Sequence, residues 1–183
     1  MKNFEVTTTD GRKFWISRAM AVCAIVVVFD ENEIPHILIN MRGEGTPDYQ
    51  YHWNIPCGYL DWDETTSEAC SREILEECSI YIEPYMWKQF GEINDSPLSN
   101  RQNVTIRKIV FLNWEQYSTA FIDGISKNPN NDIGEENEVE EIELMPISEY
   151  NIKNHKWAFN HEEILFEIKN YIEKKEHESE NDK

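Results

Sequence analysis

The pattern of apolar residues in the first part of the chain predicts paired strands. Residues 21–29 form a continuous apolar run rich in β-branched side chains, which is typical of a strand buried on both faces. After a polar turn, residues 35–41 predict the returning strand. Further upstream, an Asp10-Gly11 dipeptide lies between β-prone segments and predicts a hairpin over residues 4–16.

The polar segment after residue 58 leads into a helical pattern. Thr65 and Glu68 have the spacing of a capping box, so we expect a helix to begin at Thr66. Small apolar residues then recur every four positions, as on the buried face of a helix. These positions are Cys70, Ile74 and Cys78.

The second half of the chain continues this alternation of strands and helices. Residues 86–93, 104–112 and 139–145 predict strands, whereas 116–125 fit either a short helix or an irregular segment. A closing helix is expected to begin near Asn160, where Asn and Glu have capping spacing. Its apolar stripe consists of Ile164, Leu165, Ile168, Tyr171 and Ile172.

This order of elements predicts an α+β fold, in which a mixed sheet carries helices on both faces. With 183 residues, the chain is long enough for one domain with a sizeable core. We expect that domain to span residues 1–175, including the N-terminal hairpin. The highly charged residues 176–183 are expected to form a frayed tail.

Charge and cysteine content narrow the classes of function. The chain has 17 Lys and Arg against 35 Asp and Glu, a formal net charge of −18, which should repel nucleic-acid polymers and anionic membranes. The negative net charge does not exclude a small anionic substrate, because a bound cation can reverse the local electric field at the site. Four cysteines without Cys-x-x-Cys spacing predict free thiols in a reducing compartment, although export stays an alternative. The longest apolar run, 19–29, is too short to span a membrane, so we expect a cytoplasmic protein.

Three carboxylates crowd one side of the predicted first helix. Glu76 and Glu77 lie three and four residues after Glu73, and like charges at these spacings cost a helix about 0.2–0.5 kcal/mol per pair. A divalent cation would offset that cost, and Mg²⁺ prefers oxygen ligands of this kind. An isolated acidic run is more often a solvated face.

The residues that precede the triplet favour the metal site. Gly58 allows a sharp backbone bend that would bring a carbonyl oxygen near the cation. Arg72 adjoins the glutamates and is spaced to pair with Glu64 across the turn, which would brace the loop.

Together these residues resemble the Nudix box, G-x5-E-x7-R-E-U-x-E-E-x-G-U, where U is a bulky aliphatic residue. The chain differs from the pattern at Ser79, which stands in place of the last glycine. That glycine follows a helix, where a positive φ is common, so we expect Ser79 to affect stability rather than catalysis. The resemblance extends more loosely over residues 20–170. The matching residues are Gly58, Glu64, Arg72, Glu73, Ile74, Glu76, Glu77 and Ile80.

The resemblance implies a Nudix-like α/β/α sandwich and a Nudix hydrolase. Such an enzyme is a metal-dependent pyrophosphohydrolase of a nucleoside diphosphate linked to another moiety, as in a nucleotide sugar, a dinucleotide or a modified nucleoside triphosphate. By the same resemblance, Mg²⁺ or Mn²⁺ would be the cofactor, and Glu64 and Arg72 would support the site. The implied metal ligands are Glu73, Glu76, Glu77 and the Gly58 carbonyl.

The general base differs across this family, being either a box glutamate or a loop acid. The loop before the last predicted strand offers several acids, and we favour Glu138 among them, although each one is as readily explained by solubility. The acids in question are Glu135, Glu136, Glu138, Glu140 and Glu141.

Candidate substrate contacts lie outside the box. Arg42 ends a strand where the family often contacts phosphate, although a surface ion pair is an equal alternative. Trp53 and Tyr59 are candidates for stacking on a base, but aromatic residues are more often core or cleft wall. Arg107 and Lys108 alternate on one strand, so at most one of them faces the site. His161 is expected to cap the last helix or lie on the surface.

A second class of function stays open. A Nudix-type domain that binds a nucleotide without hydrolysing it would serve as a sensor or scaffold. We expect a small nucleotide-type partner, no nucleic-acid polymer and no membrane. Whether the N-terminal hairpin supplies a homodimer edge is left open.

Overall fold

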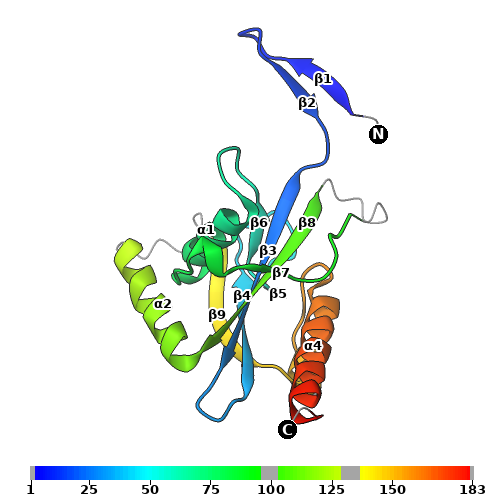
Figure 1. Ribbon diagram of the computed structural model, residues 1–183. Coiled ribbons are helices and arrows are strands. Elements are labelled where there is room, and N and C mark those ends of the chain that lie inside the picture. Colours follow the sequence, from blue (N-terminus) through cyan, green and yellow to red (C-terminus); the bar gives the residue numbers. More distant parts are fainter. Residues whose placement is uncertain (1–2, 96–102, 129–136, 182–183) are drawn as a thin grey trace.

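A computed structural model of the chain describes residues 3–95, 103–128 and 137–181. A mixed sheet of seven strands runs through the described part, with the order β5-β4-β3-β8-β7, while β6 pairs with β3 and β9 pairs with β4 (Figure 1). The strands are β3 (Met20–Phe29), β4 (Pro35–Arg42), β5 (Trp53–Asn54), β6 (Cys57–Tyr59), β7 (Lys88–Gln89), β8 (Val104–Asn113) and β9 (Val139–Pro146).

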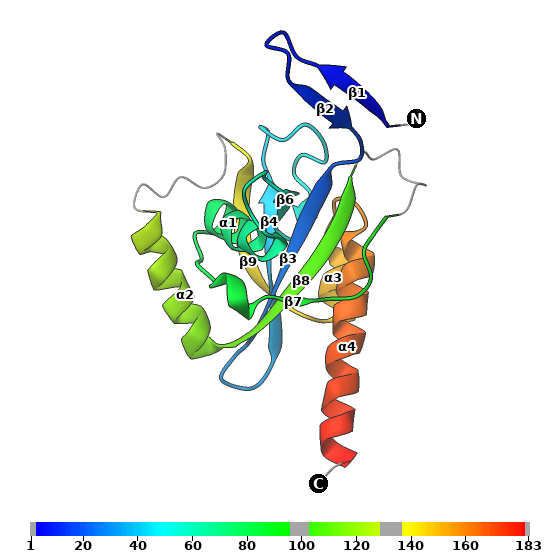
Figure 2. The same ribbon diagram turned by 45° about the horizontal axis from the view of Figure 1, so that its top comes forward.

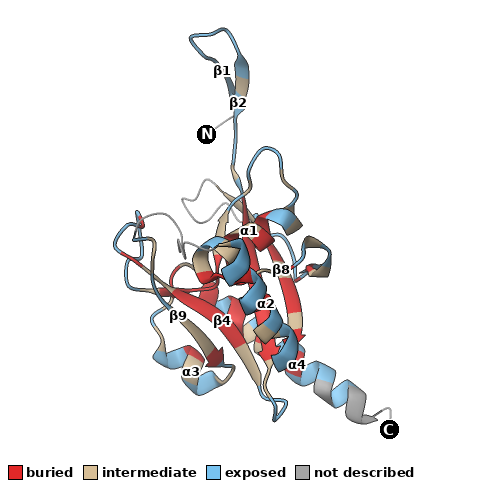
Figure 3. Ribbon diagram, turned by 90° about the vertical axis from the view of Figure 1, so that its left-hand side faces the viewer, coloured by how far each residue is buried: buried red, intermediate tan, exposed pale blue. Residues whose placement is uncertain are grey.

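Helices cover both faces of this sheet (Figure 2). One face packs against α1 (Thr66–Cys78) and α2 (Trp114–Lys127), and the other packs against α3 (Glu149–Asn154) and α4 (His161–Asn181). The long apolar strand β3 supplies both cores, because its even-numbered residues face α1 and its odd-numbered residues face α4. Figure 3 shows the buried strands between the more exposed helices. The predicted α+β sandwich is therefore observed.

The sheet opens at one end, and this opening positions the site. Strands β3 and β4 pair over only three residues, from Val27 to Phe29 on β3. Beyond that point β3 pairs with β6, whereas β4 pairs with β5, so the two strands diverge. On its other side β3 pairs in parallel with β8 over ten residues, which holds the rest of the sheet together.

The predicted N-terminal hairpin is present and projects away from the sandwich (Figure 1). Strands β1 (Phe4–Thr7) and β2 (Lys13–Ile16) form a separate two-stranded sheet. The ring of Phe14 meets the ring of Trp62, from the segment before α1, edge-on at 6.1 Å. Trp15 stays 70% exposed, so the hairpin has little core of its own.

Several predicted elements change in the structure. The strand expected over 86–93 is wrong in extent, because a short 3-10 turn η1 (Pro84–Met86) occupies its start and, of that segment, only β7 forms a strand paired with β8. The ambiguous segment 116–125 is helical and lies within α2. Helix α3 was not predicted, because six residues are too few to display a period. Helix α4 runs through Asn181, well into the tail that we expected to be frayed.

No helix within the described ranges is both long enough and apolar enough to cross a membrane. The four cysteines are free thiols, as predicted, and three of them are buried.

Candidate active site

Helix α1 begins and ends as the sequence predicts. Thr65 accepts a hydrogen bond from the Glu68 N–H, and the Glu68 carboxylate accepts one from the Thr65 N–H, which completes the capping box. At the other end, Ser79 adopts the left-handed conformation with φ 53°. The expectation of a positive φ at this position is confirmed.

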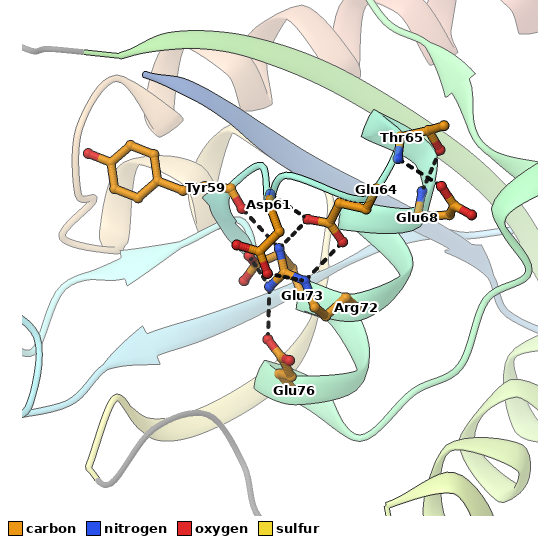
Figure 4. Close-up of polar contacts among 8 residues, drawn as sticks. All are labelled: Tyr59, Asp61, Glu64, Thr65, Glu68, Arg72, Glu73 and Glu76. Atoms are coloured by element: carbon orange, nitrogen blue, oxygen red, sulfur yellow. Dashed lines mark hydrogen bonds and ion pairs between the residues drawn. The ribbon is translucent and has the colours of Figure 1, made fainter. Parts of the chain in front are cut away.

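Arg72 lies at the centre of the polar network on α1 (Figure 4). Its guanidinium binds Glu64 through two hydrogen bonds, Nη2 to Oε1 at 2.6 Å and Nε to Oε2 at 3.1 Å. Nη2 also donates to the Tyr59 carbonyl at 2.9 Å, so the loop between β6 and α1 is tied to the helix. The Arg72 hydrogen bond is the largest cause that lowers the pKa of Glu64. Glu64 and Arg72 therefore brace the loop, as their spacing predicted.

The same guanidinium also holds two of the proposed metal ligands. Arg72 Nη1 donates to Glu73 Oε1 at 2.7 Å and to Glu76 Oε2 at 3.0 Å. Within residues 3–95, 103–128 and 137–181, no three His, Cys, Asp or Glu side chains are arranged to hold a metal ion. We attribute the lack of a preformed metal site to Arg72, which pairs with Glu73 and Glu76 in the place that a metal cation would take.

The contact between Gly58 and Glu73 brings a backbone turn against a carboxylate. A β-carbon built on Gly58 would lie 2.1 Å from Glu73 Oε1, far inside contact distance. Glycine is therefore required if the Glu73 carboxylate is to keep this place. The side chain of Glu73 is nearly buried, with 9% exposure.

Glu77 lies on the inner side of the cluster. Asn40 of β4 donates from Nδ2 to Glu77 Oε2 at 2.9 Å. Although Glu77 keeps partial exposure, desolvation is the largest cause that raises its pKa, to about 8, and the charge of Glu73 adds to it. Desolvation also raises the pKa of Glu73, to about 7, against the opposing effect of Arg72.

These features fit a divalent cation. Glu73 and Glu77 are hard oxygen donors, and each of them is held in a place that disfavours its charged form. A cation would remove that penalty because it favours the carboxylate over the carboxylic acid. Rotation of Glu73 and Glu76 away from Arg72 would then complete the ligand set, while Arg72 kept its two bonds to Glu64.

A cavity of about 1000 Å³ opens beside the cluster. It lies where β3 and β4 diverge, and it extends to the first turn of α4. The candidate residues that line it are Arg42, Gly58, Tyr59, Arg72, Glu73, Glu76, Glu77 and Glu138. Glu138 lines the same cavity as Glu77, and its charge is the last of several causes that raise the pKa of Glu77.

Arg42 is already engaged at the cavity wall. Its Nη2 forms a 3.0 Å ion pair with Asp48, and its guanidinium lies 5.0 Å from the centre of the Phe159 ring. Phe159 adopts φ 57°, which is unusual for a bulky residue. Tyr49 packs on the same ring at 4.8 Å, so these side chains form a compact wall.

Two predicted residues have other places in the structure. Trp53 does not line the cavity, because it is buried in the α4-side core with its ring 5.4 Å from that of His155. His161 is neither a surface residue nor a cap. It is buried at the start of α4, and its Nδ1 accepts a hydrogen bond from the Ile55 N–H at 2.9 Å. Its hydrogen bond with Ile55, the residue after β5, explains the error, because the two residues are far apart in sequence.

Sequence reasoning missed two buried polar residues of the cavity wall, Asn40 and Asn54, and named a third, Arg107, as one of two alternatives. Asn40, Asn54 and Arg107 are each at least 92% buried and line the cavity. The sequence does single out Asn40: it is a polar residue that directly follows the apolar run Ile37-Leu38-Ile39 within the predicted strand. For Arg107, the alternation along the strand allowed one of two neighbours to face the site. Lys108 is the one that does not, because its Nζ donates to Ser67 of α1 at 3.0 Å.

The chain belongs to the NUDIX domain family, which its sequence matches over residues 19–168. The fold and the box of glutamates thus define the class of protein, a Nudix hydrolase. No curated protein matches the sequence.

Three solved structures with the same fold share 14–21% sequence identity with this chain. The NUDIX domain of Shewanella oneidensis NrtR complexed with ADP ribose has a TM-score of 0.63 and 14% identity, with coverage of 86% of this chain and 90% of that one. A mutT/nudix family protein from Listeria innocua has a TM-score of 0.62 and 21% identity, with coverage of 87% and 97%. A bifunctional NMN adenylyltransferase/ADP ribose pyrophosphatase from Francisella tularensis, complexed with AMP and a Mn ion, has a TM-score of 0.58 and 21% identity, with coverage of 84% and 42%.

Proposed function

We propose that this Nudix hydrolase cleaves the diphosphate of a nucleoside diphosphate linked to another moiety and that it requires Mg²⁺ or Mn²⁺. The observation that carries this proposal is the meeting of Glu73, Glu76 and Glu77 with the Gly58 turn at the mouth of one cavity. ADP ribose is a reasonable first substrate to test, because two of the fold neighbours have it in their descriptions.

In this proposal Glu73, Glu76, Glu77 and the Gly58 carbonyl hold the cation. Once bound, the cation would orient a water molecule and neutralise charge on the diphosphate oxygens. Arg72 and Glu64 keep the loop closed against α1 through their paired hydrogen bonds. Asn40 fixes the direction of the Glu77 carboxylate from the opposite side.

Glu138 is our candidate for the general base. It lines the cavity and its backbone carbonyl accepts from the Gly43 N–H at 2.7 Å, which anchors it beside the loop that follows β4. A base must come within hydrogen-bond reach of the attacking water, and the position of Glu138 on the same cavity as Glu77 supports that role. Tyr59, which is 58% exposed at the cavity, is positioned to contact a base or a sugar at the rim.

A nucleotide sensor is the second candidate function. It is favoured by the ion pairs from Arg72, which occupy Glu73 and Glu76, and by the fold likeness to NrtR, which has also been solved with a 27mer DNA. The net charge of −18 argues against DNA binding by this chain, because phosphate contacts require basic surfaces. Whether the N-terminal hairpin supplies a homodimer edge stays an open question.

Product release from a panel of nucleotides, with and without Mg²⁺, tests the proposal. The panel would contain ADP ribose, other nucleotide sugars, dinucleotides and oxidised nucleoside triphosphates. We expect cleavage of at least one diphosphate that depends on the metal and falls in Glu76→Gln. Binding without cleavage across the panel would favour the sensor, and cleavage that does not need a metal would contradict the proposed mechanism.

A further inference from the structure

Within the described ranges, every buried side-chain nitrogen or oxygen atom that lacks a hydrogen-bond partner belongs to a residue that lines the cavity. Three such side-chain atoms occur, Asn40 Oδ1, Asn54 Oδ1 and Arg107 Nε, and all three residues line the cavity. Buried polar groups normally find a partner, because leaving one unpaired costs free energy. These atoms therefore indicate a ligand with matching hydrogen-bonding groups.

Strand pairings and side-chain contacts connect the three residues across the opened sheet. Asn40 contacts Glu77 and stands opposite Asn54 in the pairing of β4 with β5. Asn54 Nδ2 lies 3.8 Å from the sulfur of Cys57, and Cys57 stands opposite Cys23. Cys23 is in parallel register with Arg107 on β8. In this succession of contacts Asn54 comes between Glu77 and Arg107.

Arg107 is held in place by α4. Its Nη1 donates to Glu167 Oε2 at 2.5 Å, and its side chain is only 10% exposed. Glu167 offsets the charge of the guanidinium, so this end of the cavity is close to neutral. A fixed guanidinium with an unpaired Nε–H is a directional donor rather than a general attractor of anions.

The donors and acceptors here match hydroxyl groups better than other ligands. A phosphate group only accepts hydrogen bonds, so it would leave Asn54 Oδ1 unpaired. An apolar group would leave both Asn54 and Arg107 unpaired. A hydroxyl both donates and accepts, so a sugar ring can serve both atoms. The residues in register with Arg107 and Thr105 are Cys23 and Ala21, which carry no ring.

We propose that Asn54 and Arg107 form a subsite for a sugar, the group attached to the nucleoside diphosphate, at the inner end of the cavity. This subsite rests on the proposed function, because the diphosphate would lie at the glutamates. Asn54 Oδ1 accepts from one sugar hydroxyl, and Arg107 Nε donates to another. The two residues then select sugar-linked diphosphates over diphosphates that carry another group.

Two probes that differ only in this group test the subsite. ADP-ribose carries the sugar, whereas the β-methyl ester of ADP keeps the diphosphate without it. Isothermal titration calorimetry with Mg²⁺ would give the affinity ratio for the two probes, and kcat/KM would give the same ratio where cleavage occurs. We expect wild type to prefer ADP-ribose by at least about tenfold, the discrimination of one good hydrogen bond to a charged group.

Variants at Arg107 decide the origin of that preference. Arg107→Met should abolish it, and Arg107→Lys, which can keep the pair with Glu167 but has no Nε–H, should reduce it. Lys108→Gln is the matched control, because the neighbouring side chain faces α1, and it should keep the full preference. No preference in wild type, or equal loss on both probes in the Arg107 variants, would overturn the subsite. If ADP-ribose bound preferentially but was not cleaved, the subsite would stand and only the proposed hydrolysis would be contradicted.

Discussion

At the residue scale, the site depends on which cation neutralises the glutamates. In the structure Arg72 does so for Glu73 and Glu76, through contacts of 2.7 and 3.0 Å. Its two bonds to Glu64 do not involve those glutamates, so Arg72 can brace the loop in either state. Box residues with a supporting role were predictable from spacing alone. The competition between Arg72 and a metal was not, because it depends on side-chain conformations.

Gly58→Ala tests the contact between the turn and Glu73. The new β-carbon would lie 2.1 Å from Glu73 Oε1, so the carboxylate must move. Because that atom is the end of a flexible side chain, we expect a small change in the free energy of unfolding. Misplacement of a ligand by about 1 Å can cost about a hundredfold in rate, so metal-dependent turnover should fall by roughly that factor. Unchanged turnover in this variant would speak against Gly58 and Glu73 as parts of one site.

Ser79→Gly tests the one departure from the box. Ser79 has φ 53°, a conformation that costs a residue with a β-carbon on the order of 1 kcal/mol. We expect the glycine variant to gain up to about that free energy of unfolding in a denaturant titration, with turnover unchanged. Ser79→Ala is the control, because it keeps the β-carbon and should give no gain. A large change in turnover would mean that this turn takes part in the chemistry.

At the scale of elements, the strands and helices that display a clear period were predicted well. The capping box at Thr65, the buried strand β3 and the hairpin were all found where the sequence placed them. The divergence of β3 from β4 could not be predicted, because the strands β5 and β6 that cause it are only two and three residues long. The position of the cavity therefore had to come from the structure, and so did the burial of Trp53 and His161.

Gly124→Ala tests the packing of α2 against the end of α1. In an exposed helix this change is expected to stabilise, by about 1 kcal/mol. Here a β-carbon would lie 2.1 Å from the backbone oxygen of Ser79, which cannot move freely. We expect a loss of about 1–3 kcal/mol instead, measured by thermal or denaturant unfolding. A gain in stability would show that the two elements do not approach so closely.

At the scale of the whole molecule, the buried carboxylates link stability to pH. The pKa values of Glu77 and Glu73, about 8 and about 7, lie above the ordinary value of 4.5. Between the ordinary value of 4.5 and these raised values, the folded protein binds more protons than the unfolded chain. Its stability therefore falls as the pH rises through this range.

We expect the metal-free protein to lose stability, on the order of 2 kcal/mol, between about pH 4.5 and 8. Denaturant unfolding at several pH values in a chelator measures this. Glu77→Gln should flatten the dependence because it mimics the protonated acid, whereas Glu163→Gln, an exposed acid on α4, should not. Saturating Mg²⁺ should also flatten it. A dependence that is the same in all three proteins would contradict the raised pKa of Glu77.

The central claim is that the box glutamates bind a divalent cation. Titration with Mn²⁺, followed by electron paramagnetic resonance, measures this directly, without a substrate. We predict that Glu77→Gln weakens binding by about tenfold or more relative to wild type. Glu163→Gln, which removes the same charge from this acidic protein, should bind as wild type does. Equal Mn²⁺ affinity in wild type and Glu77→Gln would contradict the account.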